Sequence, residues 1–336
     1  MSEAATMTTN LAPIVATLEA AQRAGGRLVI RGGGSVLDAL LPTDAEVLST
    51  AELTGVIDHR PEDLVVTVRA GTPVEELSAL LATHGQECPI EPLAGHGSTV
   101  GGRLATALAG PRQLQAGRVR DWVLRVRLVT TEGRVVTAGG VTVKDVTGYD
   151  LCRLATGSWG TIGVIAEVTL KLRPIPVHSA WFTTDRPASR VLAELYRPAA
   201  LVTTGDGTFV HLEEHPDDVV AEATAVGLRA ADPPALPTTA RAAVDPGRLA
   251  GLTSWAQATG IPHAGFVGVG VCLFGGDPDA LAAAGARAAE LGGRLLVLDA
   301  GATTLPMRPP PSDPMSERVR AALDPQQILL DVRQPR

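Results

Sequence analysis

The sequence is poor in cysteine and has no long apolar run. Its three cysteines, Cys88, Cys152 and Cys272, are scattered and odd in number. This pattern excludes a disulfide framework, a CxxC metal site and an iron–sulfur cluster within the chain. The longest apolar stretches, such as 265–274, are far shorter than the ~20 residues that span a bilayer. Residues 1–10 lack the basic start and apolar core of a secretory signal. We therefore expect a cytoplasmic protein with reduced thiols and no transmembrane segment.

Charged residues are also scarce, at 19%, and the net charge is −7. This balance gives no general attraction to nucleic acid or to anionic lipid, so nucleic acid is excluded as a partner. Hydrophobic residues make up 45% of 336 residues, which is enough for a sizeable core, and the length favours two domains. The proline pair Pro174 and Pro176 marks the best boundary. We expect one domain over 1–175, with lobes at about 8–85 and 89–175, and a second over 176–336.

In the first lobe, apolar residues at helical spacing predict a helix over 8–24, and β-type runs predict strands near 27–30, 46–49 and 64–69. Thr72, Pro73 and Glu75 have the spacing of a capping box, which predicts a helix that ends near Gly85. In the second lobe, runs at 122–130 and 134–138 flank a hairpin signal at 131–133, and 163–172 is a further strand.

Beyond residue 176 the pattern changes and shows no internal repeat. Strands are predicted at 177–183, 208–213, 265–274 and 294–298, helices at 187–196, 216–230 and 278–291, and a loop at 230–247. The fold class is therefore α+β, and the second domain is expected to be a small ferredoxin-like α+β sandwich with helices on one face.

A glycine cluster, Arg31-Gly32-Gly33-Gly34-Ser35, follows the first short strand. Consecutive glycines let backbone N–H groups converge on an anion, so the cluster is typical of a phosphate cradle. It lacks both the GxGxxG spacing and the Lys-Ser/Thr ending of a P-loop. A plain turn and a phosphate cradle both remain open on these residues alone.

A longer series of motifs follows in the second lobe. It comprises Gly97-Ser98-Thr99-Val100-Gly101-Gly102, Gly110-Pro111, Arg120-Asp121, Lys-Asp-Val-Thr-Gly-Tyr-Asp-Leu at 144–151 and Gly-Ser-Trp-Gly-Thr-Ile-Gly-Val-Ile at 157–165. This order resembles the two-lobed FAD-binding domain of the vanillyl-alcohol oxidase and p-cresol methylhydroxylase (PCMH) superfamily, and within it the FAD-binding subunits of glycolate oxidases. The resemblance covers about residues 10–175 well and the remainder loosely.

The resemblance implies non-covalent FAD between the two lobes, held largely by backbone groups. The residues that it places at the cofactor are Arg31, Gly32, Gly33, Gly34 and Ser35 at the pyrophosphate, Ser98, Thr99, Gly101 and Gly102 at the ribityl and phosphate region, and Asp121, Gly163, Val164 and Ile165. Two departures stand out. Asp38 lies where the family has Thr-Lys and a glycine, and Leu329-Leu330-Asp331 replaces the Asn-Pro-Gly that usually follows Leu-Asp-Pro-x-x-Ile.

The histidines give weaker signals. His96 precedes the glycine turn, where a backbone role is favoured over a covalent flavin link. His211 to His215 match H-x-x-E-H, but a strand is predicted there, which would hold the two imidazoles too far apart for one zinc. No metal site is therefore expected. His263, in Pro-His-Ala-Gly, is a weak candidate for a catalytic residue.

These features together predict an enzyme. We expect the FAD-binding subunit of a glycolate oxidase-like complex, which oxidises a small 2-hydroxyacid by hydride transfer to flavin. The resemblance implies two partners, a larger FAD-linked oxidase subunit and an iron–sulfur subunit, through which alone the chain would contact a membrane. Two alternatives remain: a stand-alone FAD-dependent oxidoreductase of another small alcohol or acid, and a non-catalytic scaffold that keeps the FAD-domain fold.

Overall fold

The computed structural model describes residues 3–36, 38, 46–90, 97–108, 110–140, 150–298 and 314–332, with the side chains from residue 11 onward. The chain forms two compact units. The first unit consists of residues 1–108, 118–174 and 311–334, and the second of 109–117, 175–310 and 335–336. The division differs from the sequence-based one at two segments, since 109–117 belong to the second unit and 311–334 to the first.

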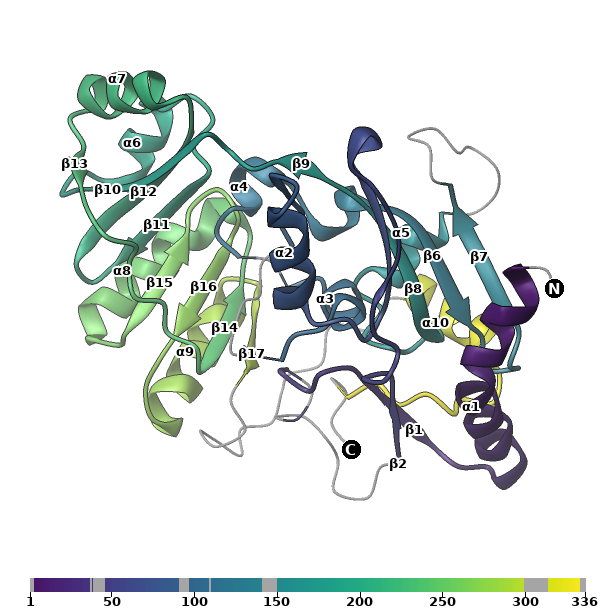
Figure 1. Ribbon diagram of the computed structural model, residues 1–336. Helices are drawn as coiled ribbons and strands as arrows, with labels where there is room; N and C mark the ends of the chain where they lie inside the picture. The colour runs from purple at the N-terminus through teal and green to yellow at the C-terminus, as the bar shows by residue number, and fades with distance from the viewer. Residues whose placement is uncertain are drawn as a thin grey trace. The chain divides into compact units, whose positions relative to one another are not determined.

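The first unit contains one five-stranded sheet and two pairs of strands (Figure 1). Its helices are α1 (Glu3–Ala24), α2 (Val74–Ala82), α3 (Val100–Thr106), α5 (Leu151–Ala155) and α10 (Pro314–Leu323). Its strands are β1 (Leu28–Arg31), β2 (Glu46–Ser49), β3 (Val56–Arg60), β4 (Val65–Arg69), β5 (Gln86–Glu87), β6 (Val123–Val129), β7 (Val135–Gly139), β8 (Val164–Lys171) and β9 (Arg173–Pro174). Strands β1 and β2 pair in parallel, β5 and β9 form a short pair, and the five-stranded antiparallel sheet has the order β3-β4-β8-β6-β7.

Helix α1 forms because its apolar residues recur at helical spacing, as the sequence predicted. Its buried face packs with β1, β2, β6, β8 and the C-terminal segment in one core cluster: Leu11, Ile14, Leu18, Ala21, Leu28, Leu48, Val129, Val164, Ala166, Ile328 and Leu329. Strand β8 is buried along both faces up to its last residue, which explains its continuous apolar run.

The C-terminal segment belongs to this unit because Asp324 holds it in place. The buried Asp324 carboxylate accepts hydrogen bonds from the backbone N–H groups of Ile328 (3.0 Å) and Leu329 (2.8 Å). Leu28 N–H then donates to Ile328 O at 2.7 Å, which adds the segment beside β1. The Leu-Asp-Pro motif thus closes the core of the first unit, and Leu329 is needed as a buried apolar residue at 3% exposure.

Two local predictions in the first unit are wrong. Thr72 does not cap α2; Pro73 stands at the N-cap position, and the Thr72 hydroxyl accepts a hydrogen bond from Gly55 N–H at 2.9 Å instead. The residues from Thr99 to Gly102 do not form a turn but begin α3, with Thr99 as its N-cap. Paired glycines have low helix propensity. The helix at this position therefore depends on contacts with other segments of the same chain.

The second unit is built on one eight-stranded antiparallel sheet (Figure 1). Its helices are α4 (Gln113–Ala116), α6 (Ala188–Glu194), α7 (Pro216–Val226), α8 (Leu249–Thr259) and α9 (Pro278–Glu290). Its strands are β10 (His178–Thr184), β11 (Ala200–Thr204), β12 (Gly207–Glu214), β13 (Arg229–Ala230), β14 (Ala240–Ala243), β15 (His263–Phe266), β16 (Val271–Phe274) and β17 (Arg294–Val297). The strand order is β13-β10-β12-β11-β15-β16-β14-β17.

This order reveals two consecutive βαββαβ modules, the ferredoxin-like topology, joined where β11 pairs with β15. The prediction of a ferredoxin-like α+β domain is confirmed. The expectation of no internal repeat is wrong, because the order of strands and helices repeats although the sequence does not show it. The register places α6 to α9 against one sheet face: Leu201 and Val210 pack with α6 and α7, and Cys272 and Phe274 with α8 and α9. We call the opposite side, against which none of the helices α6 to α9 packs, the helix-free face.

The repeat escaped notice because two of its strands have weak local signals. Strand β14, with the sequence Ala-Arg-Ala-Ala, lies inside the region expected as loop, and pairing with β16 and β17 alone makes it a strand. The expected single strand over 265–274 is a hairpin of β15 and β16, which turns at Gly268 (φ 79°) and Gly270 (φ 82°).

Candidate functional site

A groove in the first unit gathers both glycine clusters of the sequence. It has two adjoining parts that share Gly32, Gly102 and Thr106. The glycine part, about 320 Å³, is lined by Gly32, Gly33, Gly34, Ser35, Val36, Ser98, Thr99, Gly102, Arg103 and Thr106. The apolar part, about 450 Å³, is lined by Ile30, Gly32, Thr50, Gly101, Gly102, Ala105, Thr106, Trp159, Gly160, Gly163 and Ile165. Both volumes include space that opens to solvent.

The loop after β1 forms one wall of the glycine part. It approaches the second glycine cluster so closely that a Cβ atom on Gly33 would lie 1.6 Å from Gly97 O. Gly34 has φ 84°, which favours glycine. Within the described ranges, the backbone N–H groups of Gly33, Gly34 and Ser35 donate to no protein acceptor. Three N–H donors are therefore available for an anionic ligand.

Asp38, which departs from the family pattern, is neutralised by Arg31. Arg31 donates two hydrogen bonds to it, from Nε to Oδ1 and from Nη2 to Oδ2, both at 2.6 Å. These bonds lower the pKa of the Asp38 carboxyl and raise that of the Arg31 guanidinium, against an opposing effect of partial burial. The pair encloses Gly34, whose Cβ atom would lie 2.3 Å from Arg31 Nη2. The acid thus fixes the loop, and Arg31 serves the loop rather than lining the groove.

A consequence for pH dependence follows from this pair. We expect Asp38→Asn to lower the free energy of unfolding by at most about 1 kcal/mol at pH 7, because the pair is partly exposed. A carboxyl with a depressed folded pKa stabilises the protein above its unfolded pKa of about 3.9, and this stabilisation is lost as the pH falls through the folded value. Urea unfolding of both proteins from pH 7 to pH 2 should show the difference shrinking below about pH 4. A constant difference would contradict the pairing.

Helix α3 forms the opposite wall, and its first turn is already satisfied by protein. Val100 and Gly101 donate their N–H groups to Thr72 O (2.9 Å) and Ala70 O (2.7 Å). Gly102 N–H donates to the Thr99 hydroxyl at 3.2 Å. The donors for a bound anion are therefore those of the loop after β1, and α3 contributes surface shape.

The two glycines of α3 have different surroundings. A Cβ atom on Gly101 would lie 2.6 Å from Ala70 Cβ and 2.9 Å from Ala70 O, so its absence lets α3 pack against the end of β4. A Cβ atom on Gly102 would meet only Thr99 Oγ1, at 3.1 Å, and would otherwise point into open space of the groove. Gly101 is thus a packing position, whereas Gly102 keeps the groove open.

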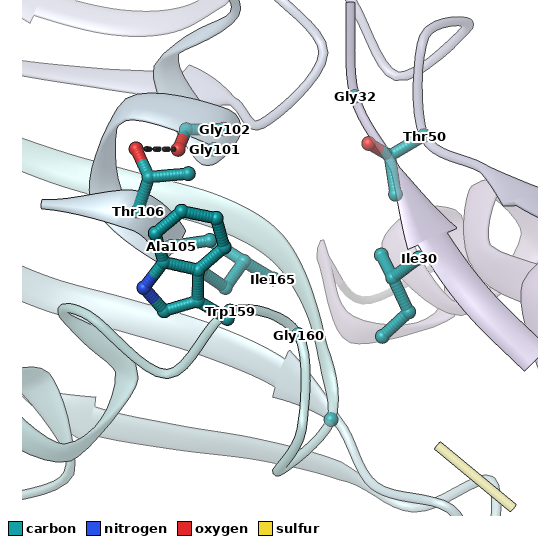
Figure 2. Close-up of a pocket in the computed structure, with 11 residues that line it drawn as sticks. Ile30, Gly32, Thr50, Gly101, Gly102, Ala105, Thr106, Trp159, Gly160 and Ile165 are labelled. Atoms are coloured by element: carbon teal, nitrogen blue, oxygen red, sulfur yellow. Dashed lines mark hydrogen bonds between the residues drawn. The ribbon is translucent and has the colours of Figure 1, made fainter. Parts of the chain in front are cut away.

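The apolar part is shaped by Trp159 and by residues of β1 and β8. In Figure 2, Trp159, Ala105 and Thr106 lie on one side and Ile30, Gly32 and Thr50 on the other, and Thr106 donates to Gly102 O at 2.9 Å. Trp159 has φ 56°, a left-handed conformation, and its backbone N–H donates a hydrogen bond to Ala105 O at 2.9 Å. An apolar slot with the Trp159 indole on one side suits a heteroaromatic ring.

The groove brings together most of the residues that the motifs indicated. It includes Gly32, Gly33, Gly34, Ser35, Ser98, Thr99, Gly101, Gly102, Gly163 and Ile165. It does not include Asp121, whose carboxylate accepts from Arg118 N–H at 2.8 Å and closes the first turn of the 3-10 helix η3 (Val119–Trp122). Val164 points into the core beside α1. His96 and 144–149 lie outside the described residues.

Sequence reasoning missed eight residues of the groove: Ile30, Val36, Thr50, Arg103, Ala105, Thr106, Trp159 and Gly160. Trp159 lies inside the Gly-x-x-Gly motif, so its position was visible although its role was not. Arg103 directly follows the paired glycines in an otherwise apolar stretch, which is the one signal that could have drawn attention to it.

His263 lies in the second unit, on β15, at 6% exposure, with Nδ1 2.9 Å from Ile261 O. It shares a strand face with Gly265, whose Cβ atom would meet Thr253 and Leu249 of α8. The side chain therefore points toward α8 and not to the helix-free face, and this position favours a structural role.

A polar cluster on the helix-free face contains Ser179, Trp181, His211, Glu213 and Arg112. Ser179 Oγ lies 2.7 Å from His211 Nε2, and Glu213 Oε1 lies 3.9 Å from the same nitrogen. Arg112 Nε pairs with Glu213 Oε1 at 2.8 Å, and the Trp181 ring stacks on the imidazole. Serine and acid meet one nitrogen, so this is no hydrolase triad, in which they use opposite ring nitrogens.

Two further features concern the part of the chain that the structure describes. No group of three or more His, Cys, Asp or Glu residues there could hold a metal ion. None of the described helices combines the length and apolar character needed to cross a membrane.

Comparison with known proteins finds similar sequences for part of this chain. The family model described as "FAD binding domain" matches residues 3–139. Glycolate oxidase subunit GlcE of Escherichia coli is 41% identical over 169 residues, which are 50% of this chain and 48% of that protein. D-2-hydroxyglutarate dehydrogenase of Xanthomonas citri pv. viticola is 31% identical over 172 residues, 51% of this chain and 35% of that protein. The matched region thus spans about half or less of each relative.

A solved structure extends the likeness to the whole fold. Alkyldihydroxyacetonephosphate synthase superposes with a TM-score of 0.66 at 16% identity and covers 94% of this chain and 73% of its own. The comparisons confirm the α+β fold class, the resemblance of about half of the chain to a glycolate oxidase subunit, and FAD as the cofactor.

Proposed function

We propose that this chain, whose first unit carries a FAD-binding domain, is the FAD-binding subunit of a glycolate oxidase-like complex that oxidises a 2-hydroxyacid. One observation carries the proposal above all. The groove combines the two glycine clusters, and its residues from Ile30 to Thr106 lie within residues 3–139, which the FAD-binding family model matches.

The groove fits FAD in shape and in hydrogen-bonding capacity. A diphosphate needs several donors, and the N–H groups of Gly33, Gly34 and Ser35 supply them with no side chain in the way. The apolar part, with Ile30, Trp159 and Ile165, suits the cofactor's adenine. We assign cofactor binding to the loop after β1, to Ser98, Thr99 and Gly102, and to the Gly163–Ile165 backbone, with Gly101 as packing support.

When bound, FAD would supply the hydride-transfer chemistry by which a 2-hydroxyacid is oxidised. The chain's own contribution in this reading is to bind the cofactor and fix its orientation. The loop after β1 holds the diphosphate, and the Arg31–Asp38 pair holds that loop. Catalytic side chains are not assigned, because the position of His263 against α8 favours packing.

Partners are part of the proposal because the chain has few means of passing electrons onward. Burial raises the pKa of the Cys88 thiol to about 12 and also raises that of Cys272, so both stay protonated and inert. GlcE is named as a subunit. We propose a larger FAD-linked oxidase subunit and an iron–sulfur subunit as partners, a cytoplasmic location, and membrane contact only through them.

The test is an activity assay of the chain alone and with its partners. We expect the purified chain to be yellow, to release FAD on acid or heat treatment, and to show almost no glycolate- or lactate-dependent dye reduction. Addition of the partner subunits should restore turnover toward the ~10 per second that is typical of enzymes. Full turnover by the chain alone would establish a stand-alone oxidoreductase. A colourless chain that takes up no added FAD would overturn the proposal.

A further inference from the structure

Two arginines share the helix-free face of the second unit at one end of its sheet. Arg241 lies on β14, and Arg294 begins the neighbouring edge strand β17 (Figure 1). Ala242 and Leu295, which follow them along the two strands, pack in the core with α8 and α9. Because strand residues alternate between faces, both arginines point to the opposite side. The register makes them diagonal neighbours, within reach of each other's long side chains.

Arg241 is partly buried and stands among apolar neighbours. In the register it lies between Leu273 on β16 and Leu296 on β17. Its Nε atom is buried and has no hydrogen-bond partner. Of the described strand residues on this face, the one acid is Glu213 on β12, which pairs with Arg112 at 2.8 Å. Within the described part of the chain, the Arg241 guanidinium thus lacks the carboxylate that a buried cation normally has.

The electrostatics of this position favour an anion. Burial, and after it the nearby charge of Arg294, lower the pKa of the Arg241 guanidinium to about 10. The group is still charged at pH 7, so the fold keeps a desolvated cation beside a second cation. An anion bound there would supply the missing acceptor and relieve the repulsion between the two charges. The planar fork of a guanidinium matches the two oxygens of a carboxylate.

We propose that Arg241, with Arg294 beside it, forms a binding site for a small carboxylate on the helix-free face of the second unit. Leu296 and Ala243, both partly exposed and on the same face, suit the carbon end of such a molecule. The choice of a carboxylate rests on the proposed function, because a 2-hydroxyacid carries this group. The pair of cations stands independently of that function, and its residues belong to the second unit, whereas the FAD groove belongs to the first.

The test is titration calorimetry of the full chain and its variants with glycolate. Arg241→Met should weaken glycolate binding by about tenfold or more, because it removes charge-assisted hydrogen bonds. Arg241→Lys should weaken it by about threefold or more, since it keeps the charge but not the fork. Glycolamide, which has the size of glycolate without its charge, should not bind. Phosphate that binds more tightly than glycolate would overturn the assignment to a carboxylate.

Arg229→Met serves as the matched control, because it removes the same charge from β13 at the other end of the sheet, where the side chain is 61% exposed. It should leave glycolate affinity within twofold. Thermal unfolding checks the fold of each variant. If Arg241→Met fails to fold, Arg241→Lys decides, and unchanged glycolate affinity in that variant would overturn the site.

The outcomes separate this inference from the proposed function. Unchanged glycolate affinity in a folded Arg241→Met variant, or no glycolate binding by the unchanged protein, would overturn the carboxylate site. FAD uptake is measured in parallel, and Arg241→Met should leave it unchanged. A chain that binds glycolate through Arg241 but takes up no FAD would keep the site and overturn the proposed function.

Discussion

Replacing Gly102 by valine is expected to abolish FAD binding while the first unit stays folded. The first added carbon would lie 3.1 Å from Thr99 Oγ1, a tight contact that a shift of the Thr99 hydroxyl by a few tenths of an ångström relieves without a movement of the α3 backbone. The remaining methyl groups occupy space that the glycine and apolar parts of the groove share. A cofactor that fills this space has no alternative path past the side chain, since Thr106 and Trp159 line the same stretch.

The measurement is the flavin-to-protein ratio after purification and after incubation with excess FAD. We expect a ratio near one for the unchanged protein and less than about a tenth for the variant, a loss of at least tenfold in affinity or about 1.4 kcal/mol. Gly251→Val is the matched control, because Gly251 is also helical, in α8, and its Cβ atom would meet nothing closer than Leu291 Cδ2 at 4.0 Å. A folded Gly102→Val protein with a full complement of FAD would show that the cofactor lies elsewhere.

Replacing the neighbouring Gly101 by valine should instead lower the stability of the first unit. Its Cβ atom would lie 2.6 Å from Ala70 Cβ and 2.9 Å from Ala70 O, distances that real Cβ contacts do not show. Gly101 N–H also donates to that same carbonyl at 2.7 Å, so α3 cannot move away without breaking the bond. Overpacking of this kind costs about 3 kcal/mol or more when backbone lies on the other side.

Urea unfolding of the flavin-free proteins checks this expectation, with Gly102→Val as the comparison. The midpoint should fall by about 1 M or more for Gly101→Val, given a slope of about 1–3 kcal/mol per M, and should change little for Gly102→Val. Equal midpoints for the two variants would show that Ala70 and β4 yield to the added side chain. Gly101 would then not be a packing position that distinguishes it from Gly102.

The sequence by itself determined the features that depend on neighbouring residues. Helical spacing placed α1, β-branched runs placed β4 and β8, and the order of glycine motifs identified a FAD-binding domain before any fold was known. It also located the loop from Gly32 to Ser35 as a turn or a phosphate cradle, since consecutive glycines let backbone N–H groups converge, and the resemblance then indicated the cradle. These signals are local, so they can be read along the chain.

Only the tertiary structure decided the features that depend on distant partners. The close approach of Ala70 shows that Gly101 is a packing position and not a ligand-binding one. The hydrogen bond from Arg31 shows that Asp38 stabilises the loop after β1. The pairing of β14, and the return of Leu329 to the core beside β1, likewise come from residues far along the chain. The physical reason is that burial, hydrogen-bond partners and charge environment are set by long-range contacts, which the order of residues does not display.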